Sequence, residues 1–235
     1  MATQHAPTRR RLDPEKRRAL ILDHTADIVA RDGVATLSIE LIGREAGISK
    51  SLVYNYFPNL TDLLRELYRR EMRRLRRQQA DAAAKARTFE DLVRSVTHVY
   101  LSYIDERGLI IERLQAEPSV SEMHDPTDFG RDAAVDYLTG FVVAQFDLPR
   151  DIARAATDIS FGLPATAGSY LLRRDLDLKT LEDMTVAMII GAVTQLQRDY
   201  VVRQRPLQPD LANVHEVATA DRSNGRRRGS GSDRS

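Results

Sequence analysis

The sequence predicts an all-α protein, and three observations support this prediction. Apolar residues recur at helical spacing through almost every long segment, helix start signals precede these segments, and glycines and prolines fall at their boundaries. The chain has 235 residues, of which 42% are hydrophobic and 29% charged, which is typical of globular proteins. This length is sufficient for one or two domains with a sizeable core.

The first helix is expected from Asp13 to about Asp32. Asp13 can accept a hydrogen bond at the N-cap, and Pro14 occupies the first helical position, where its missing N–H costs nothing. One face of this helix packs inward and carries Ile21, Thr25, Ile28 and Val29. Gly33 supplies the left-handed residue that ends the helix.

Two short helices follow in a helix-turn-helix pattern. Ser38 can cap the first of them, and Gly47 marks a turn that needs a positive φ. Ser49 can cap the next, which we expect from Lys50 to about Phe57. The inward side of the first short helix consists of Ile39, Ile42 and Ala46. Two short helices joined by a turn around a glycine form a helix-turn-helix.

The remaining helices are longer, and glycine or proline separates most of them. The predicted breaks are at Gly108, Pro118, Pro126 and Pro149, and Pro164 should bend the helix that contains it. The predicted helical segments are about 61–84, 88–107, 109–117, 127–146, 150–173 and 179–204.

Composition excludes several kinds of chemistry. The absence of cysteine excludes disulfides, thiolate nucleophiles and cysteine metal sites, and the five histidines show no ligand spacing, so we expect no metal and no cofactor. No apolar run is long enough to span a membrane and no secretory signal is recognisable, so a cytoplasmic location is expected. Residues 1–80 are basic, with 16 Lys and Arg against 10 Asp and Glu, and residues 81–204 are acidic, with 13 against 20. This asymmetry suggests that the first part meets a polyanion.

The third helix has side chains that a core cannot absorb. Val53 and Phe57 are four residues apart and share the buried face, so Lys50, Ser51, Tyr54 and Asn55 project elsewhere. Lysine and tyrosine reach phosphates, asparagine pairs with adenine, and an apolar side chain such as Leu52 packs on a thymine methyl. These properties indicate a DNA recognition helix.

Two segments of the N-terminal part resemble a known family of DNA-binding domains. The segments ILDHTADIVARDG and SIELIGREAGISKSLVYNYFPNLTDLL resemble the DNA-binding domain of the tetracycline-repressor (TetR) family of transcriptional regulators. The resemblance covers Arg17 to about Leu64, and it departs from the family pattern at Glu40 and Leu60, where basic or small polar residues are more usual. It implies that these residues face DNA, with Ser38 capping its helix against a phosphate: Ser38, Lys50, Ser51, Leu52, Tyr54, Asn55 and Tyr56.

Two arginine clusters allow more than one interpretation. Arg9, Arg10 and Arg11 either follow the DNA backbone or minor groove, or form a disordered, solubilising arm. The arginines of the fourth helix either contact phosphates or form a solvated face with glutamate partners. They are Arg69, Arg70, Arg73, Arg74, Arg76 and Arg77.

The last two long helices are candidates for a dimer interface, because one helix-turn-helix grips only one half-site. Small residues allow close approach in the first of these helices: Gly162, Ala165, Ala167 and Gly168. The second has an apolar side composed of Leu181, Met184, Met188, Ala192 and Leu196. Paired with a second copy, they would form a four-helix bundle, as the resemblance also implies; the alternative is the core of a monomer.

The middle of the chain is rich in aromatic residues, which line either a small-molecule pocket or an ordinary core. The family resemblance implies that a pocket exists here. Our candidate effector-binding residues are Tyr100, Tyr103, Arg113, Met123, His124, Tyr137 and Phe141.

The sequence predicts a chain of four parts with a single function. The parts are a disordered basic arm at 1–12, a helix-turn-helix domain at 13–64, a helical effector-binding and dimerisation domain at 65–204, and a disordered tail at 205–235. The function would be that of a repressor that binds a palindromic DNA operator as a homodimer and leaves it when an effector binds. The alternative is an architectural or partner-binding helical protein without an effector. No nucleotide-binding loop or nucleophile motif supports an enzyme.

Overall fold

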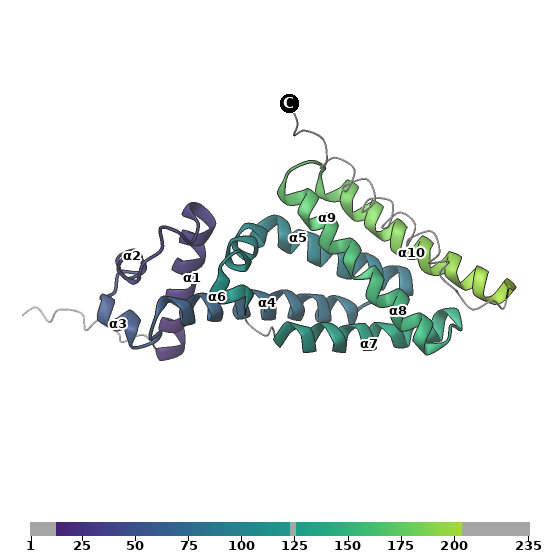
Figure 1. Cartoon of the computed structure of the whole chain (residues 1–235), viewed down its shortest axis with the longest axis horizontal. Helices are drawn as coiled ribbons and strands as arrows, with labels where there is room; N and C mark the ends of the chain where they lie inside the picture. Colours follow the sequence, from purple (N-terminus) through teal and green to yellow (C-terminus); the bar gives the residue numbers. More distant parts are fainter. Residues whose placement is uncertain (1–12, 123–125, 204–235) are drawn as a thin grey trace, which may run out of the picture. The chain divides into compact units, whose positions relative to one another are not determined.

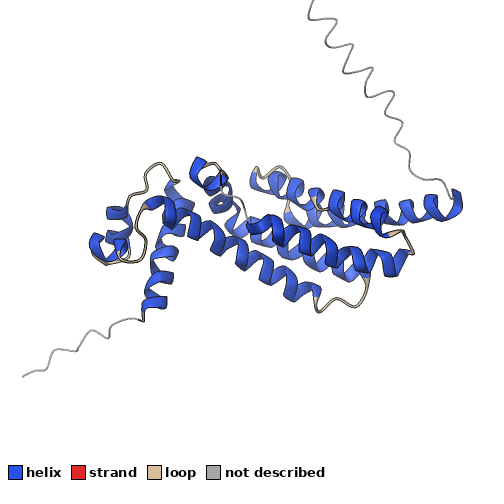
Figure 2. Ribbon diagram, turned by 60° about the horizontal axis from the view of Figure 1, so that its bottom comes forward, coloured by secondary structure: helices blue, strands red, loops and turns tan. Residues whose placement is uncertain are grey.

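The computed structural model describes residues 13–122 and 126–203, with side chains described for 13–122 and 131–200. Within these stretches the regular structure is helical and contains no strand (Figure 2). The all-α prediction is therefore confirmed. The arm predicted at 1–12 and the tail predicted at 205–235 lie outside the described residues.

Figure 1 shows how the helices follow one another. They are α1 (Pro14–Asp32), α2 (Ile39–Glu45), α3 (Lys50–Tyr54), α4 (Leu60–Ala83), α5 (Phe89–Gln115), α6 (Pro118–Ser121), α7 (Pro126–Phe146), α8 (Arg150–Ser160), α9 (Gly162–Leu172) and α10 (Leu178–Arg203). Helix α2 packs on α1 and α3, α4 packs along α5, α9 packs on α5, and α7 packs on α8.

Side-chain caps fix where the early helices begin. The hydroxyl oxygens of Ser38 and Ser49 accept hydrogen bonds from the backbone N–H groups of Leu41 and Leu52, at 3.1 and 3.2 Å. These caps satisfy N–H groups that a helix start leaves free. Asp13 stands at the N-cap of α1 but makes no such bond, and Gly33 ends that helix with a φ of +82°.

Helix α5 runs through Gly108, so the predicted break there is wrong. Gly108 is buried, and a Cβ at this position would lie 2.7 Å from Cδ2 of Leu172 on α9. The glycine therefore allows a close approach of two helices instead of ending one. Pro118, Pro126 and Pro149 do stand at helix starts.

The segment expected as one helix over 150–173 is interrupted at Phe161, where α8 ends and α9 begins. Pro164 explains the position. Its ring would collide with the carbonyl of Ser160 in a straight helix, and it has no N–H to donate to that carbonyl. The predicted bend therefore occurs just before the proline.

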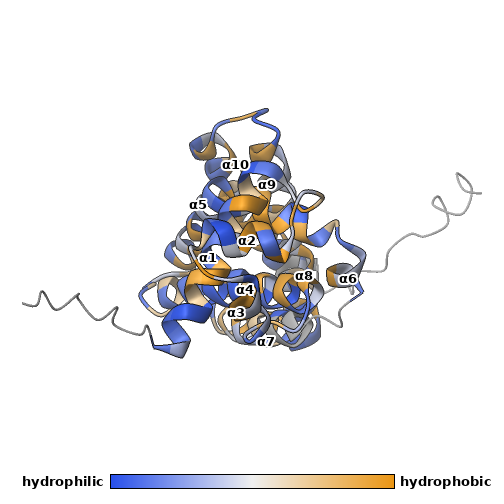
Figure 3. Ribbon diagram, turned by 90° about the vertical axis from the view of Figure 1, so that its left-hand side faces the viewer, coloured by the Kyte–Doolittle hydropathy of each residue, from blue (hydrophilic) through white to orange (hydrophobic). Residues whose placement is uncertain are grey.

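A single hydrophobic cluster links α1 to α3 with the helices that follow. Figure 3 shows the first turns of α1, beside the grey N-terminal trace, in hydrophilic blue, whereas the later turns contribute apolar side chains to the core. The largest fully buried members of this cluster include Ile21, Ile28, Ile42, Phe57, Leu63, Leu67, Leu101, Leu114 and Leu171. The packing of this cluster continues across residues 64 and 65, so the core shows no gap at the predicted domain boundary. The division into domains at 64 and 65 stays a prediction.

Candidate DNA-binding face and effector cavity

Helix α3 turns its apolar residues inward and leaves a polar surface. Val53 is fully buried, as is Phe57 just beyond the helix, whereas Leu52 and Tyr56 are half-buried. Helix α3 ends at Tyr54, three residues before the predicted end, because the N–H of Tyr56 bonds the carbonyl of Val53 in a tightened turn. Four of the predicted DNA-facing side chains are exposed: Lys50, Ser51, Tyr54 and Asn55.

An ion pair joins α3 to α2 on this surface. The ammonium of Lys50 donates to the Glu40 carboxylate, and both side chains are exposed. The hydrogen bond and charge of each partner raise the pKa of Lys50 and lower that of Glu40. The Lys50 ammonium also lies 6.0 Å from the centre of the Tyr54 ring. Glu40 therefore holds a cation that would otherwise be free to meet phosphate.

Helix α1 supports the far end of α3. The Arg18 guanidinium donates to the carbonyl oxygen of Tyr56 at 3.3 Å and lies 4.5 Å above the Phe57 ring. Gly47, with a φ of +66°, forms the turn between α2 and α3 as predicted. The exposed side chains thus stand on a rigid frame.

A cavity of about 330 Å³ lies among α4, α5, α7, α8, α9 and α10. This volume is within the range of small-molecule pockets. Its lining is predominantly apolar and includes Leu92, Val93, Val96, Leu138, Val142 and Ile189. Arg131, which also lines the cavity, pairs with Asp158 at 2.7 Å.

Only one of the predicted effector-binding residues lines this cavity. That residue is Tyr100; Met123 and His124 lie outside the described residues. Tyr103 and Arg113 are engaged elsewhere: the Tyr103 hydroxyl donates to Glu71, and the Arg113 guanidinium donates to the carbonyls at the end of α1. Tyr137 and Phe141 do not line it either; they are exposed and stack edge to face at 5.1 Å between ring centres.

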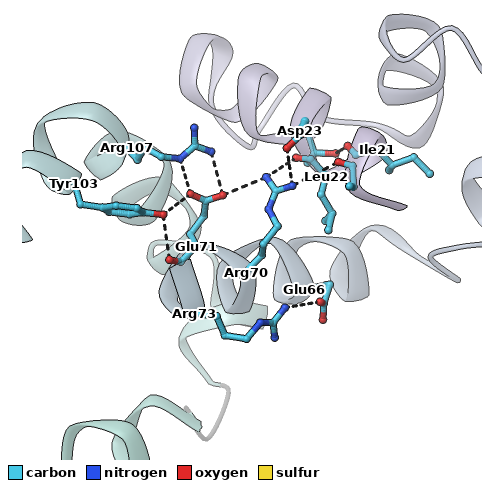
Figure 4. A network of polar contacts seen from close by, with 11 residues as sticks. Ile21, Leu22, Asp23, Glu66, Arg70, Glu71, Arg73, Tyr103 and Arg107 are labelled. Carbon is cyan, nitrogen blue, oxygen red and sulfur yellow. Dashed lines mark hydrogen bonds and ion pairs between the residues drawn. The ribbon is translucent and has the colours of Figure 1, made fainter. Parts of the chain in front are cut away.

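A buried carboxylate links α4 to α5 (Figure 4). Glu71 is fully buried and accepts hydrogen bonds from the Tyr103 hydroxyl at 2.8 Å and from Arg107 at 2.5 and 3.0 Å. Burial opposes its ionisation, but the donors from Arg107 and Tyr103 outweigh it and lower the pKa of Glu71. Burial and the bond to Glu71 raise the pKa of Tyr103. Glu71 is therefore an anion with a full set of donors.

Arg70, which directly precedes Glu71 on α4, extends this network to α1. Arg70 donates to Glu71 at 3.2 Å, to the Asp23 carboxylate at 2.7 Å, and to the Leu22 carbonyl at 3.3 Å (Figure 4). Arg69 and Arg73 pair instead with Glu66, in line with the interpretation of a face with glutamate partners. The arginines of α4 thus have different environments, which their sequence spacing did not indicate.

Comparison with known proteins identifies a family that matches the helix-turn-helix segment. Residues 21–67 match the family described as bacterial regulatory proteins, tetR family. The fatty acid metabolism regulator protein of Bacillus subtilis (strain 168) is 27% identical over 181 residues, which is 74% of this chain and 93% of that protein. The chain belongs to the TetR family of transcriptional regulators.

Solved structures of other TetR regulators share the fold. A tetR-family transcriptional regulator from Streptomyces coelicolor superposes with a TM-score of 0.64 and 19% identity, covering 90% of this chain and 100% of that one. The fatty acid degradation regulator FadR from Bacillus halodurans gives 0.62 and 17%, covering 77% and 97%. At such identities the likeness shows a common fold.

Membership of the TetR family confirms the prediction of a DNA-binding regulator and not an enzyme. The part of the chain that the structure describes has no cluster of three or more potential metal ligands, and none of its helices has the length and apolar character of a membrane span. The candidate functional sites of this TetR regulator are the α3 surface and the cavity.

The TetR regulator also exposes apolar side chains on α10 and near the end of α8. On α10, Met184 and Met188 are 50% and 54% exposed, and Ile159 near the end of α8 is 77% exposed. Gly162 and Ala165 on α9 are exposed as well, whereas Ala167 and Gly168 are buried, with Gly168 packed against α5. The predicted small-residue stripe is therefore half exposed and half buried, and Ala165 also lines the cavity.

Proposed function

We propose that this TetR-family regulator is a repressor that binds a palindromic operator as a homodimer and releases it when a small molecule fills the cavity. The observation that carries the proposal is the arrangement of three consecutive residues of α4. Arg70 bonds α1, Glu71 bonds α5, and Met72 lines the cavity. One rigid helix thus touches both the DNA-binding end and the effector cavity.

The α3 surface supports operator binding. Tyr54 and Asn55 are exposed and make no hydrogen bond through their side chains with the described parts of the chain, so their polar groups are available. Asparagine suits bidentate pairing with adenine, and tyrosine suits phosphate. Helix α3 would enter the major groove, with Ser38 and Lys50 at the backbone on either side.

The exposed apolar face of α10 supports a homodimer. Met184, Met188 and Ala192 recur every fourth residue, and all three are exposed. A second copy packed on this face and on α9 would bury them in a four-helix bundle, and would present two copies of α3 to successive turns of the major groove.

Effector release would work through α4. A ligand that fills the cavity pushes on Met72, and the bonds of Arg70 and Arg113 transmit a shift of α4 and α5 to α1. The two copies of α3 then no longer match the groove spacing. Linkage requires that operator DNA weaken ligand binding by the same factor.

The apolar lining supports a lipid-like effector. Two relatives carry names that refer to fatty acids, one as a regulator of fatty acid metabolism and one as a regulator of fatty acid degradation. The carbon chain of such a molecule matches the aliphatic side chains of α5, α7 and α10. We place the protein in the cytoplasm, where operator DNA is accessible.

Fluorescence anisotropy with duplexes from the DNA upstream of its own gene tests the proposal. We expect a palindromic site to bind about a thousandfold more tightly than random DNA, and sedimentation to give a dimer. Met188→Glu should shift sedimentation toward the monomer and lower operator affinity, while Gln78→Glu, on an exposed part of α4, should change neither. Salt-sensitive binding with little sequence preference would favour an architectural protein instead.

A further inference from the structure

One wall of the cavity has polar side chains without partners. Arg76 and Gln79 of α4, and Thr97 and Tyr100 of α5, all line the cavity. Within the described residues, Gln79, Thr97 and Tyr100 make no hydrogen bond through their side chains, and Arg76 uses only its Nε, which donates to the Met72 carbonyl at 3.2 Å. Thr97 is buried and the other three side chains are half-buried, so their polar groups are available to a ligand in the cavity.

The helix register brings these four side chains together. Helices α4 and α5 form an antiparallel hairpin in which Glu71 meets Tyr103 and Arg107. Arg76 lies five residues after Glu71 on α4, and Tyr100 lies five residues before the midpoint of Tyr103 and Arg107 on α5, so Arg76 is level with Tyr100. The next turn sets Gln79 level with Thr97 in the same way.

The opposite wall is already satisfied. The Arg131 guanidinium pairs with the Asp158 carboxylate at 2.7 Å. The hydroxyls of Thr157 and Ser160 donate to carbonyls one turn earlier, at 2.8 and 2.7 Å. Of the two described cations that line the cavity, only Arg76 has no carboxylate partner. The positive charge available to a ligand is therefore on the α4–α5 wall.

These observations specify the ligand that the cavity can hold. A guanidinium, an amide and two hydroxyls can all donate hydrogen bonds, and burial raises the pKa of Tyr100, which keeps its hydroxyl a donor. Resting on the proposed function, in which the cavity is the effector site, we propose that the effector is an aliphatic carboxylate. Its anionic end is held by Arg76 and Tyr100, and its chain lies against α7 and α10.

Titration calorimetry of the full chain with laurate and 1-dodecanol, which share a chain and differ in the head group, tests this proposal. We expect laurate to bind at least tenfold more tightly. Arg76→Met should weaken laurate by about tenfold to a hundredfold, because it removes a charged hydrogen bond, and should leave dodecanol nearly unchanged. Tyr100→Phe, which removes one hydroxyl, should weaken laurate by a smaller factor of up to about tenfold.

Two arginines provide matched controls. Arg77→Met changes an exposed residue next to Arg76, and should leave both affinities as they are. Arg131→Met removes the cavity arginine that already has a partner, and should affect laurate less than Arg76→Met does. Equal affinity for the two probes, an unaltered laurate affinity in Arg76→Met that folds normally, or no binding of laurate overturns the proposal. If laurate binds as expected but operator DNA is not released, the carboxylate site stands and the proposed switch fails.

Discussion

Two ion pairs of this regulator each join one helix to another, and they differ in burial. Glu40 and Lys50 link α2 to α3 with side chains that are 65% and 49% exposed. Glu71 and Arg107 link α4 to α5, and the Glu71 side chain is fully buried. If the exposed pair breaks, water can hydrogen-bond both side chains. The buried Glu71 carboxylate, in contrast, receives its hydrogen bonds from Arg107, Tyr103 and Arg70.

The difference separates two roles of the same chemistry. Water competes for an exposed pair, so the pair contributes little to stability, although each carboxylate still competes with phosphate for its cation. A buried pair has no such competition, and removal of one partner leaves the other unpaired in a poorly solvated site. We therefore expect Glu71 to control stability and the coupling of the cavity to the DNA-binding helices, and Glu40 to control DNA binding.

The largest effect is expected from Glu71→Ala. It leaves the Arg107 guanidinium and the Tyr103 hydroxyl without their acceptor, so the free energy of unfolding should fall by about 3 to 5 kcal/mol. Urea unfolding followed by circular dichroism measures this. Glu40→Ala is the matched control, because it breaks the exposed pair, and it should change stability little. Similar losses in the two variants would remove the distinction between the pairs.

The same carboxylate should make stability depend on pH. Its folded-state pKa lies below its ordinary value, so its contribution is complete above about pH 4.3 and is lost as the pH falls through the lower, folded-state pKa. Between neutral pH and about pH 3, the wild-type protein should therefore lose stability more steeply than Glu71→Gln, which cannot titrate here. Parallel pH profiles from urea unfolding would show that Glu71 is not the group responsible.

The sequence predicted the helix-turn-helix better than the cavity, for a physical reason. The caps by Ser38 and Ser49 and the turn at Gly47 depend on neighbours within a few residues, and such local chemistry is visible in the sequence. Helical periodicity likewise identified Val53 and Phe57 as the buried side of α3.

The cavity depends on which helices meet, and periodicity does not report this. Tyr103 and Tyr100 are both inward-facing residues of α5, yet one bonds Glu71 and the other lines the cavity. The sequence groups Arg76 with neighbouring arginines that either contact phosphates or form a solvated face, although Arg76 lies one turn after Met72 on the cavity wall. The only local signal that could have singled it out is its spacing of four from Met72.

A smaller effect is expected on the α3 surface. Tyr54→Ala combined with Asn55→Ala removes the side chains that we propose read or position the operator, and each good base contact accounts for about 1 to 3 kcal/mol of discrimination. The ratio of operator to random-DNA affinity should therefore fall by at least tenfold, with the unfolding curve nearly unchanged because both side chains are exposed. Competition anisotropy measures the ratio, with Gln78→Ala on α4 as the control. Unchanged discrimination would count against α3 as the recognition helix.

The smallest effect is expected from Glu40→Gln, and its sign is opposite to that of the other variants. The change frees Lys50 from its carboxylate and removes a negative charge beside α3, so affinity for any duplex should rise severalfold. Because one more cation is available to phosphate, the slope of log affinity against log salt should steepen by about one. Glu90→Gln removes an exposed carboxylate that pairs with Arg94 on α5, and should leave the slope alone. If both variants steepen the slope equally, Glu40 acts only through net charge. If Glu40→Gln alone steepens the slope, the exposed pair restrains DNA binding, while the buried pair maintains the fold.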